Sequence, residues 1–139
     1  MKSVRLILRL VLGAVFVWAA VTKIADPRLF VAEVSHFHLL PYPMAVALGI
    51  YLPWLELVCG LATAFGWRLR AALGLILALT CVFLVALGSA WWRHLDISCG
   101  CFGSEERGSL GWDLARDGTL AVVAGFLLAT MPGAQGKAK

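Results

Sequence analysis

The pattern Cys99-Gly100-Cys101, within the polar stretch DISCGCFGSEERG, is the part of this sequence best suited to chemistry. Alpha carbons two residues apart lie about 5.5–7 Å from each other, which overlaps the range that a disulfide tolerates. Gly100 allows the backbone angles that so small a ring needs, and a strained disulfide is easily reduced. Three interpretations stay open here: a redox pair, half of a metal site, and two unpaired small residues.

A metal site would need further ligands. His36 and His38 are the candidates, because they lie on the same predicted side of the membrane as Cys99 and Cys101. Two histidines and two cysteines can hold zinc tetrahedrally. However, C-x-C and H-x-H are unusual ligand spacings, and two helical residues at i and i+2 point in different directions. Histidines that bind no metal are therefore favoured, and the sequence predicts no metal site.

Glu56 is the most informative charged residue because it lies inside the apolar stretch YLPWLELVCG. A carboxylate at that depth in a membrane costs roughly 2.5–3.5 kcal/mol, so it should face other helices and have a partner. Lys23, near the end of the first apolar segment, is the nearest candidate cation. Two roles of these residues stay open: a structural ion pair between Lys23 and Glu56, and a proton-handling site.

Two further pairs could support redox chemistry. Arg116 could stabilise a thiolate in the nearby loop, and Asp117 follows it; interfacial snorkelling and helix capping are the alternative roles.

Cys59 and Cys81 lie about 12 and 17 Å from the turn that joins their segments, at 1.5 Å per helical residue. A second redox pair is one interpretation of these two cysteines, and packing as small apolar side chains is the other.

The elements that must position these residues are apolar and long. The chain is 61% hydrophobic and 14% charged, whereas soluble domains are nearer half apolar and a quarter charged. A helix needs about 20 apolar residues to cross a bilayer. Four segments qualify, and they run approximately over residues 4–24, 44–67, 71–91 and 114–131. The sequence thus predicts an all-α, four-transmembrane-helix bundle over residues 1–133, followed by a flexible cytoplasmic tail over 134–139.

The first connecting loop should hold a short helix of its own. Asp26 is a good N-cap, Pro27 suits the first helical position, and apolar residues then recur at helical spacing until Pro41 and Pro43 stop the pattern. We expect this helix to lie at the outer membrane interface.

Positive charge predicts the orientation. One side of the membrane carries seven basic residues and no acid, namely Lys2, Arg5, Arg9, Arg68, Arg70, Lys137 and Lys139. The other side carries five basic residues and seven acids. The positive-inside rule then places both termini in the cytoplasm. The Cys-Gly-Cys loop would face the bacterial periplasm, where disulfides persist. The net charge of +4 reflects these helix ends, so no nucleic-acid partner is predicted.

Several short stretches, in this order, resemble the MauE group of DoxX-like integral membrane proteins. They are KIADPRLF, LLPYP, LPWLEL followed by CG, ISCGCFG, and WDLARDGTL. The resemblance implies a four-helix membrane bundle with a role in periplasmic disulfide chemistry, usually beside a thioredoxin-like partner. It also implies that Cys99 and Cys101 are the redox pair of this chain. Lys23, Glu56, Arg116 and Asp117 match the group's pattern, but the resemblance assigns no role to them.

We therefore expect a thiol–disulfide oxidoreductase of the bacterial cytoplasmic membrane, whose Cys99 and Cys101 exchange disulfides with a periplasmic thioredoxin-like protein. It should contact membrane lipid and require no cofactor, with a membrane quinone as one candidate electron donor or acceptor. Two alternatives stay open: a non-enzymatic membrane assembly factor, and a metal-binding or transport protein that uses Cys99, Cys101, His36 and His38.

Overall fold

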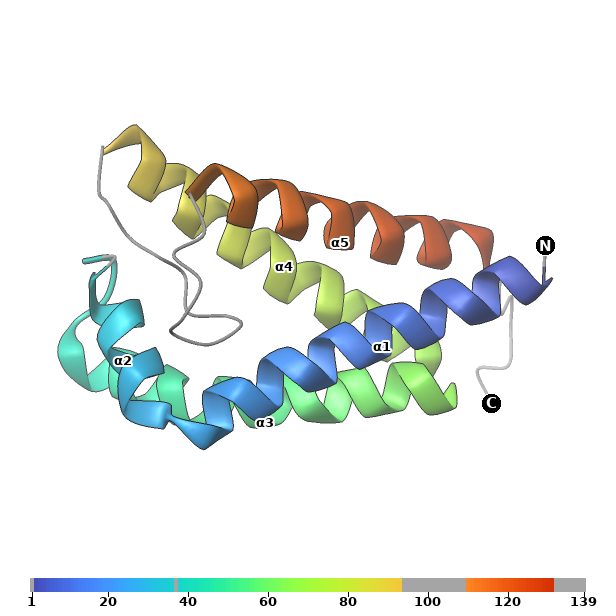
Figure 1. The fold of residues 1–139 in the computed structure, drawn as a ribbon, viewed down its shortest axis with the longest axis horizontal. Coiled ribbons are helices and arrows are strands. Elements are labelled where there is room, and N and C mark those ends of the chain that lie inside the picture. Colours follow the sequence, from blue (N-terminus) through green and yellow to red (C-terminus); the bar gives the residue numbers. More distant parts are fainter. Residues whose placement is uncertain (1, 37, 94–109, 132–139) are drawn as a thin grey trace, which may run out of the picture.

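A computed structural model describes residues 2–36, 38–93 and 110–131, and all the regular secondary structure in this part of the chain is helical. The helices are α1 (Lys2–Ala25), α2 (Pro27–His36), α3 (Tyr42–Phe65), α4 (Leu69–Trp92) and α5 (Leu110–Thr130). No strand occurs within these residues, so the all-α class is confirmed. The four predicted apolar segments lie on α1, α3, α4 and α5, and the predicted loop helix is α2 (Figure 1).

Within the described residues, α1, α3 and α4 are long and apolar enough to cross a membrane. Each of the three has 24 residues. Helix α5 has 21 residues, and it carries Asp113, Arg116 and Asp117 near its beginning. Because of these three charged residues, α5 is less apolar than α1, α3 and α4. The fourth membrane crossing therefore stays a prediction, as does the interfacial position of α2.

The helices are arranged as two pairs. Helix α1 lies along α3, α5 lies along α4, and α2 packs against α3 beyond the end of α1 (Figure 1). Between the pairs is an apolar core, to which α1, α3, α4 and α5 contribute Leu12, Phe16, Cys59, Leu73, Ile76, Ala124 and Leu127. Many large apolar side chains point outward instead, among them Trp18, Tyr51 and Val85. An apolar surface of this extent is typical of helices that contact lipid.

The pairing of α1 with α3 depends on two glycines. A Cβ atom on Gly13 would lie 2.8 Å from the carbonyl oxygen of Gly60, and one on Gly60 would lie 3.0 Å from that of Gly13. The two backbones therefore touch where a larger residue would hold them apart. Small residues at such crossings are common between membrane helices, because they let the backbones approach closely.

Local signals explain the boundaries of α2 and the turn after α3. The carboxylate of Asp26 accepts a hydrogen bond from the backbone N–H of Leu29 at 3.1 Å, which is the predicted N-cap. Helix α2 ends at His36, before the prolines that were expected to stop it, and Pro41 instead precedes α3 as its N-cap. Gly66, with φ 78°, ends α3 in the left-handed conformation that glycine favours.

Candidate functional site

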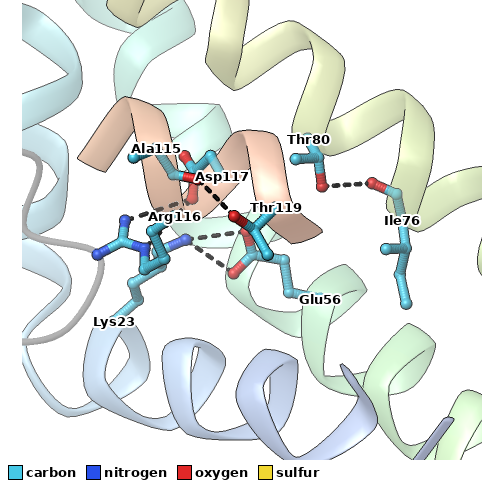
Figure 2. Close-up of polar contacts among 8 residues, drawn as sticks. All are labelled: Lys23, Glu56, Ile76, Thr80, Ala115, Arg116, Asp117 and Thr119. Atoms are coloured by element: carbon cyan, nitrogen blue, oxygen red, sulfur yellow. Dashed lines mark hydrogen bonds and ion pairs between the residues drawn. The ribbon is translucent and has the colours of Figure 1, made fainter. Parts of the chain in front are cut away.

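Lys23 and Glu56 form the ion pair expected from the sequence. The Nζ atom of Lys23, in the last turn of α1, donates to both carboxylate oxygens of Glu56 in α3 at 2.8 Å (Figure 2). Only 2% of the lysine side chain and 4% of the glutamate side chain are exposed. The two charges are thus satisfied mainly by each other, as the low dielectric of a membrane protein interior requires.

The antiparallel pairing of α1 and α3 explains how these two side chains meet. Lys23 lies ten residues after Gly13, or about 15 Å along α1, whereas Glu56 lies four residues before Gly60, or about 6 Å along α3. Each Cα–Cβ bond tilts toward the N-terminus of its own helix. Lys23 therefore leans back toward the middle of the bundle, and Glu56 leans toward the end where Lys23 lies. The long lysine side chain spans the remaining difference.

Two phenylalanines complete the surroundings of the lysine. The Nζ atom of Lys23 lies 4.8 Å from the ring centroid of Phe30 in α2 and 4.9 Å from that of Phe83 in α4. A cation this close to a ring is attracted by the negative charge of the ring face. Elements α1, α2, α3 and α4 thus all contribute to the position of one ammonium group.

Helix α5 adds a second ion pair to the same region. The Nε atom of Arg116 lies 3.3 Å from Oδ1 of Asp117, and the side chain of Asp117 is 10% exposed (Figure 2). Asp117 lies close enough to Glu56 for their charges to interact. We name Lys23, Glu56, Arg116 and Asp117 the ion cluster. Its two cations and two anions sum to zero charge, which lowers the cost of burying them together.

A small cavity lies within the ion cluster. Its lining includes Lys23, Glu56, Asp117 and the hydroxyl-bearing Thr80, and about 30 Å³ of it is open to the centre of a water molecule. A single buried water needs about 10–15 Å³ by this measure, so the cavity has room for one or two. The arrangement is suited to holding protons and water between two carboxylates.

The remaining candidate residues lie elsewhere. Cys59 is buried in the apolar core, Cys81 is exposed on α4, and both are free thiols. His36 and His38 are both exposed. Among the described residues, no three histidines, cysteines or acids gather closely enough to hold a metal ion. Cys99 and Cys101 lie outside the described residues, so the redox pair and the metal set that includes them stay predictions.

The structure does describe both ends of the segment that carries Cys99 and Cys101. Helix α4 ends at Trp92 and α5 begins at Leu110, and both points lie at the end of the bundle where α1 finishes and α2 lies (Figure 1). Asp117 follows Leu110 by seven residues, or about 10 Å of helix. The Cys-Gly-Cys segment therefore starts and returns at the end of the bundle toward which the ion cluster lies.

Sequence reasoning found the four charged residues but not the other parts of this site. Glu56 and its candidate partner Lys23 were predicted because a charge in an apolar segment needs a partner, whereas Arg116 and Asp117 were predicted from their position near the cysteine loop. Sequence reasoning assigned no role to Phe83 or Thr80, because an aromatic ring or a hydroxyl in a membrane helix needs no explanation by itself. Phe30 is one of the apolar residues that recur at helical spacing after Pro27, and that spacing does not indicate a cation beside its ring. Their positions beside a lysine depend on which helices are neighbours, and that is a property of the fold.

Fold and site together define a class: an all-helical membrane protein with several spans and a neutral ion cluster buried toward one end. The chain belongs to the MauE family, because the family model described as methylamine utilisation protein MauE matches residues 1–130. This match confirms the resemblance and fits a multi-pass membrane protein. Neither a search of curated proteins nor a search of solved structures gave a match.

Proposed function

We propose that this protein is a membrane-embedded thiol–disulfide oxidoreductase, in which Cys99 and Cys101 exchange disulfides with a separate thioredoxin-like protein. One observation supports this most directly. The segment that carries the two cysteines is attached to α4 and α5 at the end of the bundle toward which the ion cluster lies. Cysteine exchange needs a stabilised thiolate and a place for protons, and cations and carboxylates lie near the attachment points.

The exchange needs no reactant other than the two proteins. A thiolate of Cys99 or Cys101 attacks one sulfur of the partner's disulfide, and the partner's other sulfur leaves as a thiolate that takes up a proton. The second cysteine of the pair then loses its proton and attacks the mixed disulfide. This closes a Cys99–Cys101 disulfide and releases the partner as a dithiol, so two electrons pass to the partner. The reverse sequence reduces the pair, and the two reduction potentials decide the direction.

Within this proposal the ion cluster supports the cysteines without exchanging electrons. Arg116 lies within two turns of the beginning of α5, and its guanidinium is our candidate for the cation that stabilises a thiolate. Asp117, paired with Arg116, holds that guanidinium in position. Lys23 and Glu56 tie the last turn of α1 to the middle of α3 beneath this region, and their cavity gives protons a place near the bundle's end.

The proposed setting is the bacterial cytoplasmic membrane, with α5 as a fourth crossing, α2 at the outer interface and both termini in the cytoplasm. The charge distribution supports it, because every acidic residue in the described part of the chain lies away from the end where α1 begins. The cysteine pair then faces an oxidising compartment, in which a labile disulfide can form and be exchanged.

Trapping with single cysteine variants tests the exchange. In Cys99→Ser or Cys101→Ser, the remaining thiol attacks but no second thiol resolves the intermediate, so at least one variant should retain a thioredoxin-like protein in a mixed disulfide. Cells are acid-quenched, thiols are alkylated, and the linked protein is identified by mass spectrometry. Cys81→Ser, which removes an exposed cysteine elsewhere, should behave as the wild type.

Two results would count against the proposal. One is that neither single variant traps a partner although both are present in the membrane. The other is that Cys99 and Cys101 show the same alkylation with and without reductant. Together they would leave a non-enzymatic assembly factor as the better description of this chain.

A further inference from the structure

A second pocket lies at the other end of the bundle, where α1 and α4 begin and α5 ends. It has a volume of about 520 Å³, within the usual range of small-molecule sites. Four basic residues line it: Lys2, Arg5, Arg9 and Arg70. The rest of the lining is apolar and includes Leu6, Leu127 and Met131. We name this the basic pocket.

Among the residues that the structure describes, no carboxylate side chain lies at this end. Residues 1–25, 57–95 and 118–139 contain no aspartate or glutamate, and these ranges include every segment that reaches the basic pocket. Among the described residues, no carboxylate is therefore paired with Lys2, Arg5 or Arg9, so these three cations can accept an anion from outside the chain.

Two of the arginines are held in a way that favours an anion. The Nη1 atom of Arg5 donates to the carbonyl oxygen of Thr130 at 3.0 Å, which fixes its guanidinium at the end of α5. The guanidinium of Arg9 lies beside Gly66, where a Cβ atom would come within 2.9 Å of Nη1. The Nε atom of Arg9 is buried and has no hydrogen-bond partner in the described part of the chain. A buried N–H donor of this kind needs an acceptor.

We propose that the basic pocket binds the phosphate of an anionic phospholipid head group. A lipid head group and a free phosphate would both place a phosphate among the guanidinium groups, which bind it through paired N–H donors. A lipid is favoured over a free phosphate because Leu6, Leu127 and Met131 lie beside the cations and can contact the glycerol and first acyl carbons. The cations also lie within the first eight residues of α1 and the first two of α4, two helices apolar enough to cross a membrane, and head groups lie near such helix ends.

Lipid retention measured by native mass spectrometry tests this proposal. Full-length protein is released from mixed phosphatidylglycerol and phosphatidylcholine micelles, and the bound lipids are counted. The wild type should retain phosphatidylglycerol preferentially. Each neutralised pocket cation should weaken retention about fivefold, so Arg5→Gln/Arg9→Gln should lower it about 25-fold. Lys2→Gln, at an exposed first-turn residue where folding is not at risk, should lower it about fivefold.

Arg68→Gln is the matched control, since it removes the same charge at the same end from a residue that does not line the pocket. Retention in this variant should change less than twofold. If Arg68→Gln and Lys2→Gln lose retention equally, the effect is general surface charge and the site is refuted. If millimolar inorganic phosphate displaces the lipid from the wild type, the lipid assignment is wrong and the pocket is a phosphate site.

Discussion

A double-mutant cycle on Lys23 and Glu56 tests whether their ion pair determines the stability of the bundle. Glu56→Gln keeps the shape of the side chain and removes its charge, and Lys23→Met keeps the length of the side chain and removes its charge. Each single variant leaves one buried charge without its partner, while the double variant removes both. The structure predicts that each single variant is less stable than the double variant.

The magnitude follows from the geometry of the pair. Two unit charges 2.8 Å apart attract by about 6 kcal/mol at an effective dielectric constant of 20. Burying each ion costs several kcal/mol, so the pair as a whole gains little. Removing one partner keeps the burial cost of the other without the attraction. We therefore expect each single variant to lose about 3–5 kcal/mol of unfolding free energy, and the double variant to lose less than either.

Unfolding free energies can be measured in mixed micelles by titration with a denaturing detergent, followed by far-ultraviolet circular dichroism. Arg28→Gln is the control, because it removes a charge from an exposed position in α2. This control should lie within about 0.5 kcal/mol of the wild type, as surface substitutions usually do.

Additivity would refute the reasoning. If the loss in the double variant equals the sum of the two single losses, Lys23 and Glu56 do not interact in the folded protein. If each single variant loses less than about 1 kcal/mol, the two charges are hydrated in the membrane protein and are not buried as the structure has them. Both outcomes are distinguishable from misfolding, because the circular dichroism baseline of each variant reports its helix content.

Two other contacts predict smaller changes in stability. Gly13→Ala should destabilise the protein by about 1–3 kcal/mol, because its Cβ would press on the backbone of α3. Gly74→Ala, which meets no atom within 4 Å, should be neutral or stabilise by up to about 1 kcal/mol; equal effects in thermal unfolding would contradict the close approach. Asp26→Ala should destabilise α2 by about 1 kcal/mol, whereas Asp26→Asn should preserve it. Hydrogen exchange at Leu29 measures this, and identical protection in both variants would argue against the cap.

The helices and one ion pair could be predicted from the sequence because their signals are local. Long apolar runs indicated α1, α3 and α4, and a capping residue followed by proline indicated α2. The partner of Glu56 could be predicted because few cations lie in apolar segments at a suitable depth. Each of these arguments needs only the residue type and its distance along one helix.

Other features depend on how the helices are paired, which composition does not specify. Cys59 and Cys81 have similar calculated depths, but depth does not say which way a side chain points. In the structure Cys59 faces the core, whereas Cys81 is exposed on α4. Lys2, Arg5, Arg9 and Arg70 were likewise interpreted only as orientation signals. Their gathering around one pocket depends on α1, α4 and α5 meeting at the same end.

The free-energy cost of burying the ion cluster bears on its function. A buried ion pair is weak evidence for stability, since apolar side chains of the same size are often as stable or more stable. If the double variant of Lys23 and Glu56 folds well, the charges are not needed to hold the bundle together. Trapping of a partner by Cys99→Ser or Cys101→Ser in that background then separates two roles. Unchanged trapping would mean that the cluster only fixes the helix register, whereas lost trapping in a folded protein would connect the buried charges to the chemistry of the cysteines.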